Sequence, residues 1–464
     1  MRFRLFFFPI YLLWMGLFEG SFNAPLTWSQ DALPYTSRTL KYPAWHSTVR
    51  GDHRIVGMAG SMVGLADTKL SNIDNPAGLA MTVGDTGIEF MRNAVTDRHL
   101  VATEGIEFTD FAASASHYPW GFGYAAWTPL SQSATYSLSP NSTMTPTIEA
   151  TEFRFSAARV LLKNKLSLGA SLVFAKSSQT LSISNPAETL RDSGTAWSGS
   201  LGLMIQFPKR WIAGVSYHLP YTTTNQQFPQ NSNGIENFFQ PASSPARVGL
   251  GVSWIPNRFF QFGSSLYFIG TDENTALLRD ESARVGQTIT LQPRLGLSYQ
   301  WIDYQELQGT FTLGTYYEVS RISDRSDRIH FNSGLLIRPW VLSFGWTIDI
   351  ATDYTNQIFT AGVDVGKIFK KLGWLPKTYE PPRAGLFPKA NRYSDAGLPR
   401  PLVKRWKQRE KVDLIEAGKN LPKAIQKDLK DTKKGIEGFF ERLGDVPNQI
   451  KKGMDRIDDA PSKN

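Results

Sequence analysis

Residues 166–174 read Leu-Ser-Leu-Gly-Ala-Ser-Leu-Val-Phe, and this stretch decides the fold class. Successive side chains of a β-strand point to opposite faces, so Leu166, Leu168 and Leu172 share one face. The small and polar side chains between them share the other. Residues 246–256 repeat the pattern. The alternation predicts strands that are apolar on one side only.

The same alternation recurs between residues 86 and 369, whereas long helical patterns are absent there. Short polar segments separate the apolar stretches and mark the turns. We predict fourteen strands, over residues 86–94, 106–118, 121–136, 149–162, 166–183, 196–207, 211–222, 246–256, 259–271, 289–302, 307–321, 329–338, 341–350 and 357–369.

The connections between these strands alternate in length. Residues 163–165 form one of the tight turns, and residues 137–148, 184–195 and 223–245 form long polar links. Short turns at one end, long loops at the other and an even number of strands are typical of outer-membrane barrels. A soluble sandwich would share the alternation but not this pattern of turns. The predicted fold is an all-β transmembrane antiparallel β-barrel.

Aromatic residues gather beside the tight turns, where a girdle at the membrane–water interface would lie. The residues of this predicted girdle are Trp120, Phe207, Trp211, Trp254, Phe259, Trp301, Tyr304 and Trp340. The last predicted strand also ends on an aromatic residue, Phe369.

The N-terminus predicts export. Residues 1–24 have a basic start at Arg2 and Arg4, an apolar centre and small residues up to Ala24, as in a secretory signal peptide. A single membrane anchor is the alternative, but the apolar centre is shorter than the roughly 20 residues that a spanning helix needs. Residues 25–50 follow as an irregular leader segment. The mature chain is expected in the cell outer membrane.

Two further segments differ from the barrel in composition. Residues 51–85 are rich in glycine, and we expect neither a strand nor a stable helix there. Residues 370–464 have a net charge of +10, against −1 for the rest of the chain. Their first part is rich in proline and predicted to be extended, and amphipathic helices are expected after it. This basic tail is predicted to lie in the periplasm.

Residues 57–67 form a glycine- and alanine-rich run that ends in Ala-Asp, and residues 75–79 read Asn-Pro-Ala-Gly-Leu. In these two motifs the chain resembles the FadL family of outer-membrane transporters for long-chain fatty acids and other hydrophobic molecules. The resemblance covers roughly residues 51–369. It implies a fourteen-stranded barrel with residues 51–85 as a plug inside it. The leader segment and the basic tail depart from the family pattern.

The resemblance also implies a passive route, in which a hydrophobic small molecule enters a pocket and leaves sideways into membrane lipid through a kinked third strand. Pro129 falls in the third predicted strand, where it cannot donate to the ladder. It marks either this lateral exit or merely the end of the strand. Asn75, Pro76 and Gly78 either hold the plug against the barrel wall or form a turn without ligand contact.

Apolar residues also occur in the longest predicted loop. They are Phe228, Ile235, Phe238 and Phe239. An exposed apolar patch on an outer loop would capture hydrophobic ligands. The alternative, packing of the loop against itself, is the stronger interpretation for these residues.

Nothing in the sequence points to an enzyme or a cofactor. There is no cysteine, and the six histidines have no metal-ligand spacing. A Gly-x-Ser-x-Gly elbow and a phosphate loop are both missing. Export makes nucleic acid an unsuitable partner for the basic tail. Residues 377–464 fit a periplasmic protein or an anionic lipid surface. The alternative function is therefore a non-transporting barrel that serves as an envelope scaffold or secretion partner.

Overall fold

The structure is a computed structural model. It describes residues 48–81, 86–97, 106–117, 119–133, 136–139, 141–161, 166–184, 187–207, 210–225, 243–257, 259–271, 289–304, 306–319, 326–371 and 385–386. The predicted signal peptide, most of the leader segment and nearly all of the basic tail lie outside these residues. No helix among the described residues is long and apolar enough to cross a membrane.

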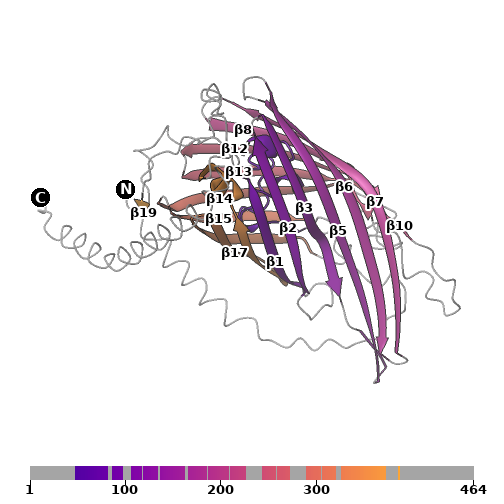
Figure 1. Cartoon of the computed structure of the whole chain (residues 1–464). Coiled ribbons are helices and arrows are strands. Elements are labelled where there is room, and N and C mark those ends of the chain that lie inside the picture. The colour runs from indigo at the N-terminus through magenta and orange to yellow at the C-terminus, as the bar shows by residue number, and fades with distance from the viewer. Residues whose placement is uncertain are drawn as a thin grey trace, which may run out of the picture.

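Fourteen long strands form an antiparallel barrel (Figure 1). They are β1 (Gly87–Asp97), β2 (Ile106–His117), β3 (Trp120–Ser133), β5 (Ser142–Leu161), β6 (Leu166–Ser184), β7 (Ala187–Gln206), β8 (Trp211–His218), β12 (Arg247–Asn257), β13 (Phe260–Ile269), β14 (Thr290–Asp303), β15 (Leu307–Glu318), β16 (Arg328–Pro339), β17 (Leu342–Ala351) and β18 (Tyr354–Val363). Pairing of β1 with β18, from Ile88 opposite Val363 to Asp97 opposite Tyr354, closes the barrel. The predicted strand number is confirmed.

Five short strands complete the sheets. They are β4 (Tyr136–Ser139), β9 (Tyr221–Thr222), β10 (Thr224–Asn225), β11 (Ser243–Ser244) and β19 (Gly385–Leu386). β9 pairs only with β11, outside the barrel sheet, and β19 pairs with β14 at Ile302 and Asp303.

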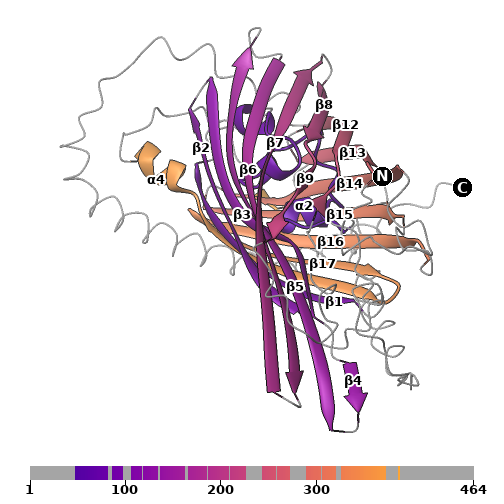
Figure 2. The same ribbon diagram turned by 90° about the vertical axis from the view of Figure 1, so that its right-hand side faces the viewer.

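Two strands, β5 and β7, are much longer than predicted, and both pair with β6. The ladder between β5 and β6 continues out to Met144 opposite Ile183, and that between β6 and β7 to Ser184 opposite Ala187. Figure 2 shows these strands projecting beyond the others. The prediction of links at 137–148 and 184–195 was therefore wrong. Serine and threonine replace the apolar face there, which removes the sequence signal while the backbone hydrogen bonds continue.

The end of the barrel also differs from the prediction. β18 stops at Val363, and residues Val365–Lys371 form the helix α4 instead of continuing the strand. The Asp364 carboxylate accepts a hydrogen bond from the Lys367 backbone N–H at 2.9 Å, as a helix N-cap does. Phe369 therefore lies in a helix and does not end a strand.

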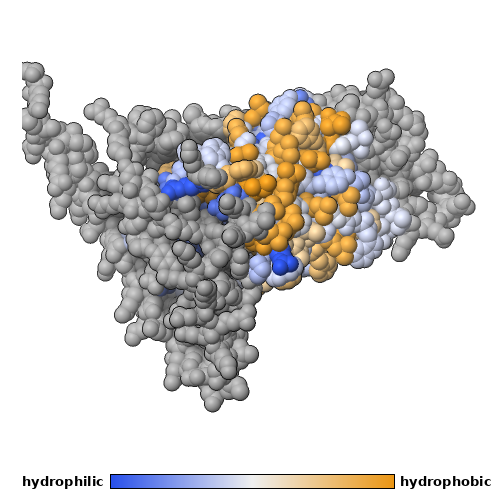
Figure 3. Space-filling model, turned by 90° about the horizontal axis from the view of Figure 1, so that it is seen from above, coloured by the Kyte–Doolittle hydropathy of each residue, from blue (hydrophilic) through white to orange (hydrophobic). Residues whose placement is uncertain are grey.

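The predicted faces of the strands are confirmed. In β12, Leu250 and Val252 are exposed on the outside, whereas Gly251 and Ser253 are buried inside. Hydrophobic residues gather on the described outer surface in Figure 3. Of the predicted girdle, Trp120, Phe207, Trp211 and Trp254 are exposed, and the Trp211 and Trp254 rings stack. Phe259 is buried, so its assignment to the girdle was wrong.

The glycine-rich segment fills the barrel interior (Figure 2). It contains α2 (His53–Gly57), the 3-10 turn η1 (Ser71–Ile73) and α3 (Gly78–Met81), where the sequence predicted neither a strand nor a stable helix. Asp52 caps α2 by accepting hydrogen bonds from the Arg54 and Ile55 N–H groups. Helices this short are unstable in water, and packing against the barrel wall stabilises them here. We call residues 49–81 the plug.

Candidate functional site

The Asn-Pro-Ala-Gly motif lies against the wall at a pair of glycines. Asn75 Nδ2 donates to the Val63 carbonyl oxygen at 2.8 Å and to that of Leu203, in β7, at 3.2 Å. Added Cβ atoms on the cross-strand partners Gly169 and Gly202 would lie 2.4 Å from Ala77 N and 2.1 Å from Asn75 Oδ1. The motif thus packs backbone against backbone on β6 and β7.

Pro76 and Gly78 are buried in the same contact. A Cβ on Gly78 would lie 2.1 Å from the Ala66 carbonyl oxygen, which excludes any larger residue. The Ser167 hydroxyl donates to the Ala77 carbonyl oxygen at 2.7 Å and adds a second bond between motif and wall.

The plug also lies close to glycines of other barrel strands. Wall glycines at which a Cβ would approach plug atoms form what we call the glycine belt: Gly87, Gly121, Gly123, Gly169, Gly202, Gly214, Gly249, Gly251, Gly263, Gly296, Gly314, Gly334 and Gly345. Without side chains at these positions, the plug backbone lies directly on the wall. The belt fixes the plug near the tight-turn end of the barrel.

The barrel wall is interrupted at Pro129. The ladder between β2 and β3 ends with Phe111 opposite Ala126, although β2 continues to pair with β1 as far as Ile106. On its other side, β3 has a bulge in which Thr128 and Pro129 oppose a single residue of β5. We call residues 106–110 of β2 and 127–130 of β3 the wall break.

Side chains satisfy the backbone at the wall break. Asp110 Oδ1 accepts a hydrogen bond from the Thr128 N–H at 2.7 Å, and its Oδ2 accepts one from Asn93 Nδ2 at 3.0 Å. Arg50, from the plug, donates to the Thr128 carbonyl oxygen at 3.1 Å, and its Cζ lies 4.9 Å from the centre of the Phe108 ring. Thr128 therefore needs no ladder partner on β2.

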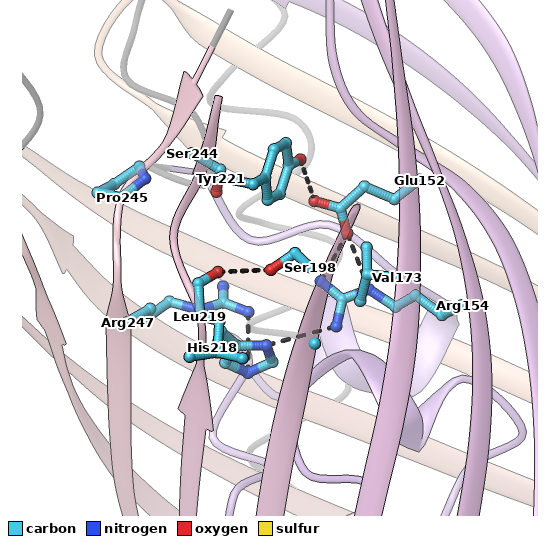
Figure 4. A pocket seen from close by; sticks show the side chains of 11 residues that line it. Glu152, Arg154, Val173, Ser198, His218, Leu219, Tyr221, Ser244, Pro245 and Arg247 are labelled. Atoms are coloured by element: carbon cyan, nitrogen blue, oxygen red, sulfur yellow. Dashed lines mark hydrogen bonds and ion pairs between the residues drawn. The ribbon is translucent and has the colours of Figure 1, made fainter. Parts of the chain in front are cut away.

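A buried polar cluster contacts the wall break at Trp127, and Figure 4 shows its members Glu152, Arg154 and Tyr221. Glu152 accepts hydrogen bonds from Trp127 Nε1 at 3.0 Å, Arg154 Nε at 2.8 Å and the Tyr221 hydroxyl at 2.6 Å. We call these residues the Glu152 cluster.

His218 extends the cluster toward β12. Its Nδ1 lies 3.4 Å from Arg154 Nη1 and its Nε2 lies 3.3 Å from Arg247 Nη2. Arg247 also donates to the plug, at the Ile73 carbonyl oxygen. The cavity among these side chains measures about 10 Å³, room for roughly one water molecule.

A second network ties the plug to the opposite wall. The Val49 N–H donates to the Tyr316 hydroxyl oxygen at 3.2 Å, and that hydroxyl donates to Asp349 at 2.9 Å. His330 lies between Asp349 and Glu318, 2.9 and 2.8 Å away. The first residues of the plug therefore reach across the lumen, from β15 at Val49 to the wall break at Arg50.

The sequence-predicted residues fall in different places. Asn75, Pro76 and Gly78 meet on the glycine belt, and Pro129 lies at the wall break. Phe228, Ile235, Phe238 and Phe239 lie outside the described residues. Among the described residues, no group of three or more His, Asp or Glu side chains is arranged to hold a metal ion.

Six side chains that complete these sites were not predicted from the sequence: Arg50, Asp110, Glu152, Arg154, His218 and Arg247. Charged residues at inward-facing strand positions were the available signal for most of them, because such positions in a plugged barrel must find partners.

No model of a protein family matches the chain, and no curated protein matches it. Solved structures do match. The CymD monoaromatic hydrocarbon channel aligns with a TM-score of 0.49 and 12% identity, over 69% of this chain and 97% of that one. A Pseudomonas aeruginosa FadL homologue aligns with a TM-score of 0.48 and 13% identity, over 68% and 99%.

The toluene transporter TodX of Pseudomonas putida aligns with a TM-score of 0.46 and 12% identity, over 68% of this chain and 98% of that one. At such identities the likeness concerns the fold. The sites described above rest on this chain's own residues.

Proposed function

We propose that this chain is an outer-membrane channel for passive uptake of hydrophobic small molecules, such as long-chain fatty acids. The wall break carries the proposal. Because β2 and β3 share no ladder bonds beyond Ala126, a ligand can pass sideways there without breaking the sheet. Pro129 adds no N–H donor that would need a partner. In this proposal Asn75, Pro76 and Gly78 position the plug beside the path.

The driving force is transfer of apolar surface from water into lipid. It amounts to about 25 cal/mol for each Å² of apolar surface removed from water, so no energy source is needed. The plug must move during passage, because it lies against the glycine belt and only about 10 Å³ is free in the Glu152 cluster. Phe228, Phe238 and Phe239 are candidates for first contact with the ligand.

Uptake into proteoliposomes tests the proposal, with labelled fatty acids and alkylbenzenes as the probes. Pro129→Thr supplies an N–H donor and a strand-forming residue that favour closing the wall break. We expect uptake to fall about tenfold, which corresponds to about 1.4 kcal/mol on the barrier. Pro293→Thr is the matched control, because Pro293 lies in β14 opposite Leu266 on a continuous ladder with β13. Equal uptake by the two variants would contradict a lateral exit at Pro129.

The tightly packed plug and small cavity favour a second candidate, an envelope scaffold that acts through its basic tail. Deletion of residues 377–464 separates the two. A channel keeps its uptake after this deletion, whereas a scaffold loses the capture of its periplasmic partner. Wild-type chain that takes up none of the probes but retains a tail-dependent partner would favour the scaffold.

A further inference from the structure

The wall has another interruption, between β7 and β8. Their ladder ends with Ser200 opposite His218, and β7 next pairs at Thr195, with Thr224 of β10. Among the described residues, positions 196–199 of β7 have no ladder partner on this side. We call this interruption, between residues 196–199 and 219–223, the β7–β8 gap.

Leu219 connects the two sides of the β7–β8 gap through two hydrogen bonds. The Leu219 N–H donates to the Gly199 carbonyl oxygen at 2.9 Å, and the Ser198 hydroxyl donates to the Leu219 carbonyl oxygen at 2.8 Å. Tyr221 turns inward to Glu152, and its strand pairs with β11 instead of β7. Widening the gap therefore costs little backbone hydrogen bonding.

An apolar groove lies outside the gap, over β5 to β8. Its volume is about 590 Å³. Phe155 and Leu172 line it and are about half exposed on the lipid-facing side, and Leu219 lines it at the gap. An extended hydrocarbon chain would meet mainly carbon along this groove.

Inside the gap, the cluster holds more donors than acceptors. A neutral imidazole has one acceptor nitrogen, so His218 can accept from Arg154 or from Arg247 but not from both. Glu152 compensates the charge of Arg154. Arg247 is 4% exposed, and its Nε has no hydrogen-bond partner in the structure. Asp74 supplies a nearby negative charge for Arg247 but accepts its hydrogen bond from the Tyr267 hydroxyl, so a further acceptor would satisfy the Arg247 Nε–H.

The groove and the inner cavity share three lining residues, Ser198, Gly199 and Leu219. We propose that the β7–β8 gap binds a free single-chain carboxylate amphiphile from the membrane, with its chain in the groove and its carboxylate at Arg247 and His218. This inference deepens the proposed function by placing a binding site for this ligand class at the β7–β8 gap. Binding itself is independent of that function, and only the later passage of the ligand through the barrel rests on it.

The size of the inner cavity selects the occupant. About 10 Å³ admits one oxygen atom of a carboxylate in place of a water molecule. A phosphodiester would bring further oxygens, a glycerol unit and another chain through the gap. We therefore commit to a free carboxylate amphiphile and treat phospholipid as an outcome of the test.

Binding is measured by contact quenching in neutral detergent on the full chain. The sequence has no cysteine, so Leu201→Cys carries a single bimane fluorophore on the outer face of β7, two residues from Gly199. Phe331→Cys, on the outer face of β16, is the control position. The probes are nitroxide-labelled stearate, its uncharged methyl ester and nitroxide-labelled phosphatidylglycerol.

We expect saturable quenching by stearate at position 201 and not at position 331. Arg247→Gln should weaken it about tenfold, or about 1.4 kcal/mol. Arg328→Gln, which removes an arginine from the opposite wall, should leave it unchanged. Equal quenching by the ester or by phosphatidylglycerol would overturn the proposal, and so would equal affinity in Arg247→Gln or equal quenching at both positions.

Ser198→Ala keeps the test decisive where Arg247→Gln does not fold. Loss of the bond to Leu219 should speed the onset of quenching, and an unchanged onset would overturn the gap as the entry. Pro129→Thr distinguishes the two proposals. If Pro129→Thr loses uptake but keeps quenching by stearate, the wall break is the exit and binding at the β7–β8 gap is independent of it. If uptake depends on Pro129 but stearate does not quench at position 201, the β7–β8 gap proposal is contradicted and the proposed channel function stands.

Discussion

Arg50 donates a hydrogen bond to the carbonyl oxygen of Thr128 at 3.1 Å and lies over the ring of Phe108. Thr128 belongs to β3 and Phe108 to β2. A single plug side chain therefore spans the two strands at the point where they share no ladder bonds. Through these contacts of Arg50, a displacement of the plug would also displace β2 and β3 at the wall break.

Replacing Arg50 by Gln should weaken the attachment of the plug to the wall and make the wall break more mobile. A hydrogen bond from a charged donor contributes about 1.5–3 kcal/mol, and the contact with Phe108 is lost as well. We expect faster hydrogen exchange in residues 49–60 and more frequent conductance events in planar bilayers. Arg92→Gln is the control, because the ion pair of Arg92 with Glu107 is exposed on the outside. Hydrogen exchange in Arg50→Gln that matched this control would contradict a role of Arg50 in holding the plug at the wall break.

Replacing Gly202 by Ala should displace the plug motif. The added Cβ would lie 2.1 Å from Asn75 Oδ1, and overpacking of this kind costs about 1–3 kcal/mol. We expect a lower unfolding temperature and a smaller folded yield. In the control Gly270→Ala, the nearest atom is 3.1 Å away, so small shifts suffice. Equal folded yields would mean that the plug does not rest on this glycine.

Glu152 and Tyr221 should differ in their contribution to stability. Glu152→Gln leaves the buried Arg154 cation without its carboxylate, at a cost of about 3–5 kcal/mol. Tyr221→Phe removes one hydrogen bond, at a cost of about 1 kcal/mol. Urea unfolding from lipid vesicles measures both, and Glu149→Gln, which is exposed on β5, is the control. A larger effect of Tyr221→Phe than of Glu152→Gln would contradict Glu152 as the centre of the cluster.

These contacts show how much of the fold could be predicted from the sequence. Alternation in residues such as Leu250 and Gly251 reports lipid on one side and lumen on the other, so strand number and faces could be predicted. The outer parts of β5 and β7 lack a regular alternation of apolar and polar residues, so their sequence carries no such signal. The helix α4 depends on a single N-cap at Asp364 after the ladder ends.

The sites were predicted only where a residue type is unusual for its place. Pro129 is conspicuous inside a strand, and the Asn-Pro-Ala-Gly run is conspicuous as a motif. Arg50 and Asp110 are ordinary residues whose role depends on meeting Thr128, which only the closed barrel brings about. The β7–β8 gap is visible only from which residues of β7 and β8 pair with each other, and the predicted strand boundaries do not give this register.

Tyr316 and Tyr317 are neighbours on β15 and test the anchor of the plug at the opposite wall. The Tyr316 hydroxyl accepts from the Val49 N–H and donates to Asp349, whereas the Tyr317 hydroxyl contacts Asp327 on the exposed side. Tyr316→Phe leaves a buried N–H and a buried carboxylate each short of a partner, and such unsatisfied groups cost about 1–3 kcal/mol. We expect faster hydrogen exchange at Val49 and a lower unfolding temperature in Tyr316→Phe.

Tyr317→Phe should change neither quantity, since its hydroxyl is exposed and its partner can bond to water. The pair therefore controls for loss of a tyrosine hydroxyl in the same strand. If Tyr316→Phe also leaves exchange at Val49 unchanged, the plug is held by the glycine belt and Arg50 alone. In that case its first residues would be free to leave the β15 side during ligand passage.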